Sequence, residues 1–122
     1  MLSSSLAEEI NVAQKLAAEV ATLVDLGKHE LARLRSNDLH DRTLTIIVRW
    51  DKTLPALSKE NFEKAKFQVE TLRDVVSRLG ANTAAPTQRQ FSHMRGRCEK
   101  IKDIFIAEHA SALRRKDEAD NG

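Results

Sequence analysis

An apolar pattern near the start of the chain restricts the possible folds more than any other feature. Small or apolar residues recur at alternating steps of four and three through Leu6, Ile10, Ala13, Ala17, Val20, Val24, Gly27, Leu31 and Leu34. We call these nine positions the N-terminal stripe. Because steps of three and four return to the same side of an α-helix, they predict a long helix with one continuous apolar face. Such a face needs a partner that covers it.

Local signals place this first helix at residues 5–36. Ser5 and Glu8 have the spacing of a capping box, in which the two side chains bond each other's backbone amides. At the other end, the run Ser36-Asn37-Asp38 is typical of turns and caps. The predicted helix therefore has about nine turns.

Gly27 is the position of the stripe that suits a helix least, since glycine lowers helix stability by roughly 1 kcal/mol relative to alanine. It either ends the helix or lets another backbone come close. Its place on the stripe, together with Ala13 and Ala17, favours a close approach.

Residues 38–54 are ambiguous, because the segment Thr43–Trp50 is rich in the β-branched residues that strands favour. A lone strand would have no partner in this chain. If the segment is a helix, Asp38 caps its start and Pro55 ends it. One face of that helix then carries Leu39, Thr43, Ile47, Trp50 and Leu54. We therefore predict a short second helix over residues 38–54.

Two further helices are predicted in the C-terminal half of the chain. Ser58 as N-cap and Gly80 as C-terminal glycine delimit a helix over residues 58–79, whose inner positions are Phe62, Ala65, Val69, Leu72, Val76 and Leu79. A capping box of Thr87 and Gln90 starts a helix over residues 87–116, whose inner positions are Phe91, Met94, Cys98, Ile101 and Phe105. We expect residues 117–122 to be a frayed tail.

Composition supports an all-α fold. The 122 residues are 41% hydrophobic and 31% charged, with no tyrosine, four glycines and two prolines, so the usual materials of strands and tight turns are scarce. We predict a single domain over residues 1–122. Its fold is a four-helix antiparallel coiled-coil-like bundle with one long N-terminal helix and one short second helix.

No motif in the sequence is typical of an enzyme, so we expect no catalytic site, no cofactor and no small-molecule substrate. The nearest approach to a metal site is the group His93, Met94 and Cys98, with Glu99 adjacent. His93 lies one position off the face that Met94 and Cys98 share, and Cys98 suits a small buried apolar position. Acidic residues stand at ordinary salt-pair spacings, as in Glu60 and Lys64.

Net charge, cysteine content and the spacing of charged residues predict the cellular compartment of the protein. A net charge of +2 does not by itself require a polyanionic partner, and the single cysteine cannot form an intramolecular disulfide. Charges also interrupt every apolar run well short of the roughly 20 residues that cross a bilayer. We therefore expect a cytoplasmic protein in a reducing environment, without a membrane partner.

The unmatched length of the first helix suggests how the protein works. A second helix of about half its length cannot cover the whole stripe, and uncovered apolar surface usually binds a partner. We therefore expect a protein–protein interaction module, such as an adaptor, regulator, inhibitor or chaperone-like subunit, that binds where the N-terminal stripe outruns the rest of the bundle. Both a dimer and a dedicated binding groove fit the sequence, and a homodimer is favoured. Trp50, the only tryptophan, either anchors the short helix in the core or contacts the partner.

Nucleic-acid binding is the first alternative, because basic residues gather in the last predicted helix. Eight of them oppose Glu99, Asp103 and Glu108, which gives a local charge of +5; they are Arg89, Arg95, Arg97, Lys100, Lys102, Arg114, Arg115 and Lys116. Such a helix can lie along a phosphate backbone or an acidic protein. The segment has no base-stacking aromatic cluster, and its charges spread around the helix, so a solvated face or an acidic protein partner is favoured.

Histidine phosphotransfer is the second alternative. The pair His40-Asp41, followed by Leu44-Thr45-Ile46-Ile47, resembles the phosphoacceptor helix of dimerising histidine kinases over fewer than a dozen residues. The spacing after Asp41 departs from that family's pattern, and an exposed histidine at a helix start is the simpler interpretation. His29-Glu30-Leu31 is similar to phosphotransfer bundles but lacks their Lys-Gly pair.

Overall fold

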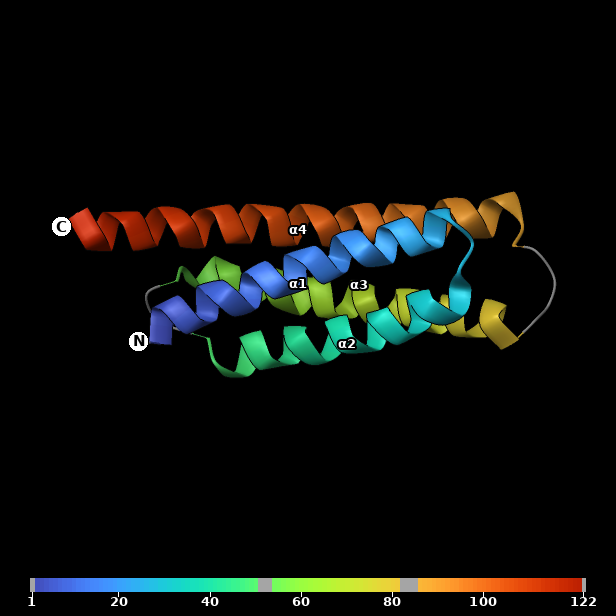
Figure 1. Ribbon diagram of the computed structural model, residues 1–122, viewed down its shortest axis with the longest axis horizontal. Coiled ribbons are helices and arrows are strands. Elements are labelled where there is room, and N and C mark those ends of the chain that lie inside the picture. The colour runs from blue at the N-terminus through green and yellow to red at the C-terminus, as the bar shows by residue number, and fades with distance from the viewer. Residues whose placement is uncertain (1, 51–53, 82–85, 122) are drawn as a thin grey trace.

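The computed structural model describes residues 2–50, 54–81 and 86–121, and these form four α-helices without a strand. The helices are α1 (Leu2–Asp25), α2 (His29–Val48), α3 (Ala56–Ala81) and α4 (Gln88–Asn121). Each helix runs back alongside the one before it, so both termini lie at the same end of the molecule (Figure 1). The prediction of an all-helical chain with four packed helices is thus confirmed.

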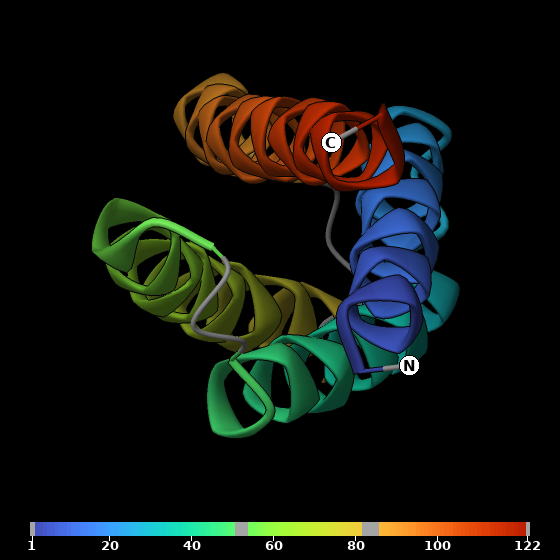
Figure 2. The same cartoon turned by 90° about the vertical axis from the view of Figure 1, so that its left-hand side faces the viewer.

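The helices form a ring around one core. Each packs against its neighbours in sequence, and α1 closes the ring against α4, whereas the described backbones of the diagonal pairs have no Cα atoms within 8 Å of each other (Figure 2). Phe62 of α3 and Phe105 of α4 meet in the core with ring centroids 5.8 Å apart. Residues from all four helices complete this apolar centre.

The predicted single helix over residues 5–36 is wrong, because the chain turns at Gly27. This glycine has φ +72°, a left-handed conformation that other residues adopt only at a cost. Its N–H donates to the Val24 carbonyl at 3.1 Å and the Lys28 N–H donates to the Leu23 carbonyl at 2.9 Å. These two bonds define a Schellman motif, which ends a helix by satisfying its last carbonyls.

The close approach expected at Gly27 is also absent. A Cβ added there would meet no heavy atom within 4 Å among the residues described. The glycine is therefore required by backbone conformation and not by packing. The other end of α1 differs too, since the helix begins at Leu2 and Ser5 lies within it instead of capping it.

Helix α2 begins and ends earlier than the predicted 38–54. It starts at His29, which places Asp38 inside the helix, 4.0 Å from Arg42 one turn later. The β-branched segment is helical as far as Val48, and Trp50 lies beyond the helix. With 24 residues in α1 and 20 in α2, the prediction of a long first and a short second helix is wrong.

The third and fourth helices match their predictions more closely. Helix α3 begins two residues before Ser58 and continues through Gly80, so neither residue delimits it as predicted. The Thr87 capping box is confirmed: the Gln90 N–H donates to Thr87 Oγ1 at 3.2 Å, and the Thr87 N–H donates to Gln90 Oε1 at 2.9 Å. Helix α4 continues to Asn121, so the predicted frayed tail over residues 117–122 is wrong as far as Asn121. The end of this helix projects past the other helices (Figure 1).

Candidate interaction surfaces

The turn at Gly27 divides the N-terminal stripe between the core and the surface. Its first six positions are at most 4% exposed and pack inside the chain's own bundle; they are Leu6, Ile10, Ala13, Ala17, Val20 and Val24. In contrast, Leu31 is 44% exposed and Leu34 is 48% exposed. The stripe is therefore not one continuous face.

The change follows from a shift in register. Residues 26–28 interrupt the helix, after which the buried positions of α2 run Ala32, Ser36, Leu39, Thr43 and Ile46. These again follow steps of four and three, but they start one residue later than Leu31. Two of the inward residues are polar, and each satisfies its hydroxyl locally: Ser36 donates to the Ala32 carbonyl at 2.6 Å and Thr43 to the Leu39 carbonyl at 2.7 Å.

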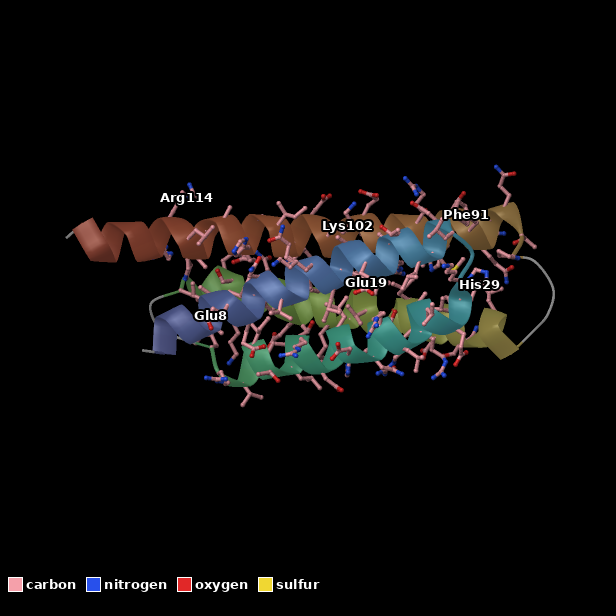
Figure 3. The ribbon with its side chains drawn as sticks, in the orientation of Figure 1. Glu8, Glu19, His29, Phe91, Lys102 and Arg114 are labelled. Carbon is pink, nitrogen blue, oxygen red and sulfur yellow. The ribbon has the colours of Figure 1, made fainter. Side chains whose placement is uncertain are left out.

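Three exposed leucines result at one end of the bundle. Leu26 in the turn is 62% exposed and precedes Leu31 and Leu34, which lie three apart on α2 and so share a face. We call these three residues the leucine surface. Charged pairs flank it in the sequence, with Arg33 bonded to Glu30 and Arg35 Nε 3.0 Å from Glu19 Oε1 of α1. His29, which begins α2, marks this end of the molecule in Figure 3.

Trp50 packs against the core from the α2–α3 connection and is partly buried. Lys59 Nζ lies 5.8 Å from the centroid of its ring, a distance at which a cation is attracted to the aromatic face. Its indole Nε1 is buried and has no hydrogen-bond partner among the residues that the structure describes. Of the two roles left open by the sequence, the core anchor is the one visible in this structure.

The basic residues of α4 do not form a single stripe. Arg95 is bonded to Asp25 of α1, which raises the pKa of the arginine, and Arg97 donates to Gln68 of α3 on the other flank. Lys102 Nζ lies 4.0 Å from Glu99 on the same helix. Four other basic residues, Arg89, Lys100, Arg114 and Arg115, are exposed, and the side chain of Lys116 lies outside the described residues. Lys102 and Arg114 are both labelled on α4 in Figure 3.

A groove lies where α3 ends and α4 begins. It is lined by Val75 and Arg78 of α3 and by Arg89, Gln90 and His93 of α4. The sequence indicated Arg89 as a phosphate or acidic-partner contact, His93 only in the nearest approach to a metal site, and Gln90 only as part of a helix cap. Arg78 was missed, and so was the grouping of these residues, because it exists only when two helix ends meet, although the predicted connection between these helices was a signal for their proximity.

Neither histidine proposed for phosphotransfer is at an exposed helix start. His40 lies in the middle of α2 with its side chain 14% exposed, and its Nε2 is 3.1 Å from Glu70 Oε1 of α3. His29 begins α2 but is partly buried, and its Nδ1 is enclosed without a hydrogen-bond partner in the described part of the chain. The interpretation of His40 as an exposed surface residue is wrong.

Cys98 and Glu108 are both buried, at different places in the bundle. Cys98 is 2% exposed, and burial raises the pKa of its thiol to about 12. Glu108 is 8% exposed and accepts a 2.7 Å hydrogen bond from Asn61 Nδ2 across the α3–α4 interface. Within residues 2–50, 54–81 and 86–121, no three His, Cys, Asp or Glu residues converge as metal ligands.

Comparisons with known proteins give no relative: no family model, curated protein or solved structure matches this chain. In the segments that the structure describes, no helix has an apolar stretch long enough to cross a lipid bilayer.

Proposed function

We propose that this chain is a protein-binding helical module that forms a homodimer through the leucine surface. The observation that carries the proposal is the exposure of Leu26, Leu31 and Leu34 within nine residues of sequence at one end of the bundle. Other large exposed apolar residues are distributed over all four helices, and isolated ones are normal on a soluble surface; they are Val12, Val48, Leu57, Phe67, Ile106 and Leu113.

A second copy is the partner that requires the fewest assumptions. In a two-fold symmetric dimer one surface meets itself, so Leu31 of one protomer packs against Leu34 of the other and the reverse. The ion pairs of Arg33 and Arg35 then lie near the edge of the interface, where polar residues are usual. A single apolar surface with a charged surround is sufficient for such an arrangement.

The size of the surface limits the strength of the dimer. Full burial of a leucine contributes about 1.5–3 kcal/mol, and these side chains are already partly covered. Association costs at least about 4 kcal/mol in lost freedom of motion. We therefore expect a dissociation constant between about 1 µM and about 1 mM.

The wider proposal is an adaptor or regulatory subunit of the reducing cytoplasm, with its helices packed antiparallel in a coiled-coil-like manner. Buried positions at steps of three and four in α1, α2 and α3 support that packing. The lone buried Cys98 is compatible with a reducing compartment. The buried pairing of His40 gives phosphotransfer no support, and the internal partners of Arg95 and Arg97 weaken the case for a nucleic-acid stripe.

Sedimentation equilibrium of the full chain tests the proposal. Over about 1 µM to about 1 mM, the average mass of the wild type should rise with concentration from that of the monomer toward that of the dimer. The variant with Leu31→Gln and Leu34→Gln should remain monomeric, because both apolar contacts are lost. A control with Phe67→Gln and Ile106→Gln removes two apolar residues of α3 and α4 that are 61% and 47% exposed, and it should behave as the wild type.

Two results would contradict the proposed dimer. One is a wild type that stays monomeric throughout the concentration range. The other is an equal loss of association in the control variant, which would mean that apolar exposure in general, and not the leucine surface, drives it.

A further inference from the structure

The groove between the end of α3 and the start of α4 combines a cationic lining with an apolar wall. Its volume is about 280 Å³, near the lower end of pockets that hold small molecules. Arg78 and Arg89 contribute two guanidinium groups, Gln90 an amide and His93 an imidazole, while Val75 is apolar. Among the described residues that line it there is no carboxylate, so none of them neutralises the charge of the arginines.

The two arginines differ from most others in this protein. Arg33, Arg42 and Arg95 each reach a carboxylate, from Glu30, Glu9 and Asp25 respectively. Arg78 and Arg89, in contrast, have neither a hydrogen bond nor an ion pair with any residue that the structure describes. Two like charges on one groove repel each other, and an anion between them removes that repulsion. The groove is thus complementary to a bound anion.

The donors favour a phosphate group over a carboxylate. Each planar guanidinium can donate two parallel hydrogen bonds, and a phosphate monoester offers three charged oxygens that can engage both arginines at once. Gln90 and His93 supply further donors at the same groove. A carboxylate has only two oxygens and would leave part of this set unused.

We propose that this groove binds a small phosphate monoester, with Arg78 and Arg89 holding the phosphate and Val75 contacting the esterified group. The limited volume favours a small ligand. An extended duplex would also need the basic residues farther along α4, and two of those are occupied: Arg95 by Asp25 and Arg97 by Gln68. The groove shares no lining residue with the leucine surface, although both lie at the end of the bundle that holds the α1–α2 turn (Figure 1), and the proposal does not use the dimer.

Titration of the full chain with phenyl phosphate, followed by amide NMR, tests the site at low ionic strength. We expect saturable shifts at Val75, Gln90 and His93. Replacing Arg78→Gln and Arg89→Gln together should weaken binding by at least about tenfold, since each arginine supplies charge-assisted bonds. The control Lys15→Gln with Arg114→Gln removes the same charge from exposed positions outside the groove and should change the affinity less than about twofold.

Parallel titrations distinguish the possible sources of the anion. Inorganic phosphate should bind at the same residues but more weakly, because it has no group for Val75. Benzoate should bind at least about tenfold more weakly than phenyl phosphate, since it cannot engage both guanidinium forks. All four arginine and lysine positions are exposed, so the variants should keep the wild-type circular dichroism spectrum.

Four results would overturn the proposal. These are no saturable shifts with phenyl phosphate, equal loss of affinity in both double variants, benzoate binding as tight as phenyl phosphate, and preferential binding of a short DNA duplex that all basic substitutions weaken alike. The last would favour nucleic-acid binding by diffuse charge.

Discussion

Cys98 shows how its surroundings set the chemistry of a single side chain. It lies on the inner face of α4 and is 2% exposed, so the charged thiolate would have to exist without water. Desolvation is the main cause that raises the pKa of the thiol, from 9.0 to about 12, and the negative charges of Asp25 and Glu99 add to it. At neutral pH the thiol is protonated, and its burial disfavours the thiolate that a nucleophile or a metal ligand requires.

This burial predicts a loss of stability in alkaline solution. In the unfolded chain the thiol ionises near its ordinary pKa of 9.0, whereas in the folded chain it stays protonated to about 12. Unfolding therefore releases a proton in this range, and stability falls as pH rises. The contribution is fully present below pH 9 and is lost progressively toward pH 12.

Urea unfolding of the wild type and of Cys98→Ala, at about pH 7.5 and about pH 10, measures this effect. Other groups titrate in both proteins, so the relevant quantity is the difference between their free energies of unfolding. The wild type should lose more stability than Cys98→Ala on going to the higher pH. Equal losses in the two proteins would show that Cys98 is not buried as a thiol.

Gly27 and Gly96 show that the same residue type acts oppositely at a helix end and within a helix. Gly27 has φ +72° in the turn between α1 and α2, whereas Gly96 lies inside α4 and is exposed. A Cβ would meet no heavy atom within 4 Å at either position among the described residues. Only backbone conformation therefore distinguishes the two sites.

Alanine substitution should change stability in opposite directions. Gly27→Ala should lower the free energy of unfolding by about 1 kcal/mol, because alanine is strained in the left-handed region. Gly96→Ala should raise it by about 1 kcal/mol, because alanine favours the helix. Chemical denaturation measures both, and a stabilising Gly27→Ala would mean that α1 and α2 are one helix.

Helix boundaries could be predicted where a cap is local and not where packing decides. The Thr87–Gln90 box involves four adjacent residues, so the sequence alone was sufficient to locate the start of α4. Gly27 carried two opposing signals, its left-handed preference and its place on the stripe. Leu31 and Leu34 continue the three-and-four spacing by coincidence across the turn. The spacing therefore favoured a continuous helix over a helix end at Gly27.

The inward face of α2 was harder to predict for another reason. Ser36 and Thr43 are fully buried, yet neither is apolar, so the true register of this helix has no strong hydrophobic periodicity. Their hydroxyls bond to the carbonyl one turn earlier, which makes burial possible. Packing against α1 and α3, and not intrinsic preference, selects this face.

At the level of the assembled bundle, the candidate sites depend on residues far apart in sequence. Arg95 meets Asp25 across 70 positions, and the groove of Arg78 and Arg89 requires the end of α3 beside the start of α4. Composition and spacing predicted four helices, but they could not show which charges are neutralised within the molecule. Arg78 and Arg89, which have no partner among the described residues, and the leucine surface can therefore be recognised only in the folded chain.

The division of one stripe into a core part and a surface part can be measured with two substitutions. Ile10 is 0% exposed in α1, whereas Leu31 is 44% exposed in α2. At protein concentrations where only monomer sediments, Ile10→Ala should lower the free energy of unfolding by about 2–5 kcal/mol. Leu31→Ala should lower it by less than about 1 kcal/mol, because the residue fills no enclosed space. Similar large losses in both variants would contradict the turn at Gly27 and the leucine surface that it creates.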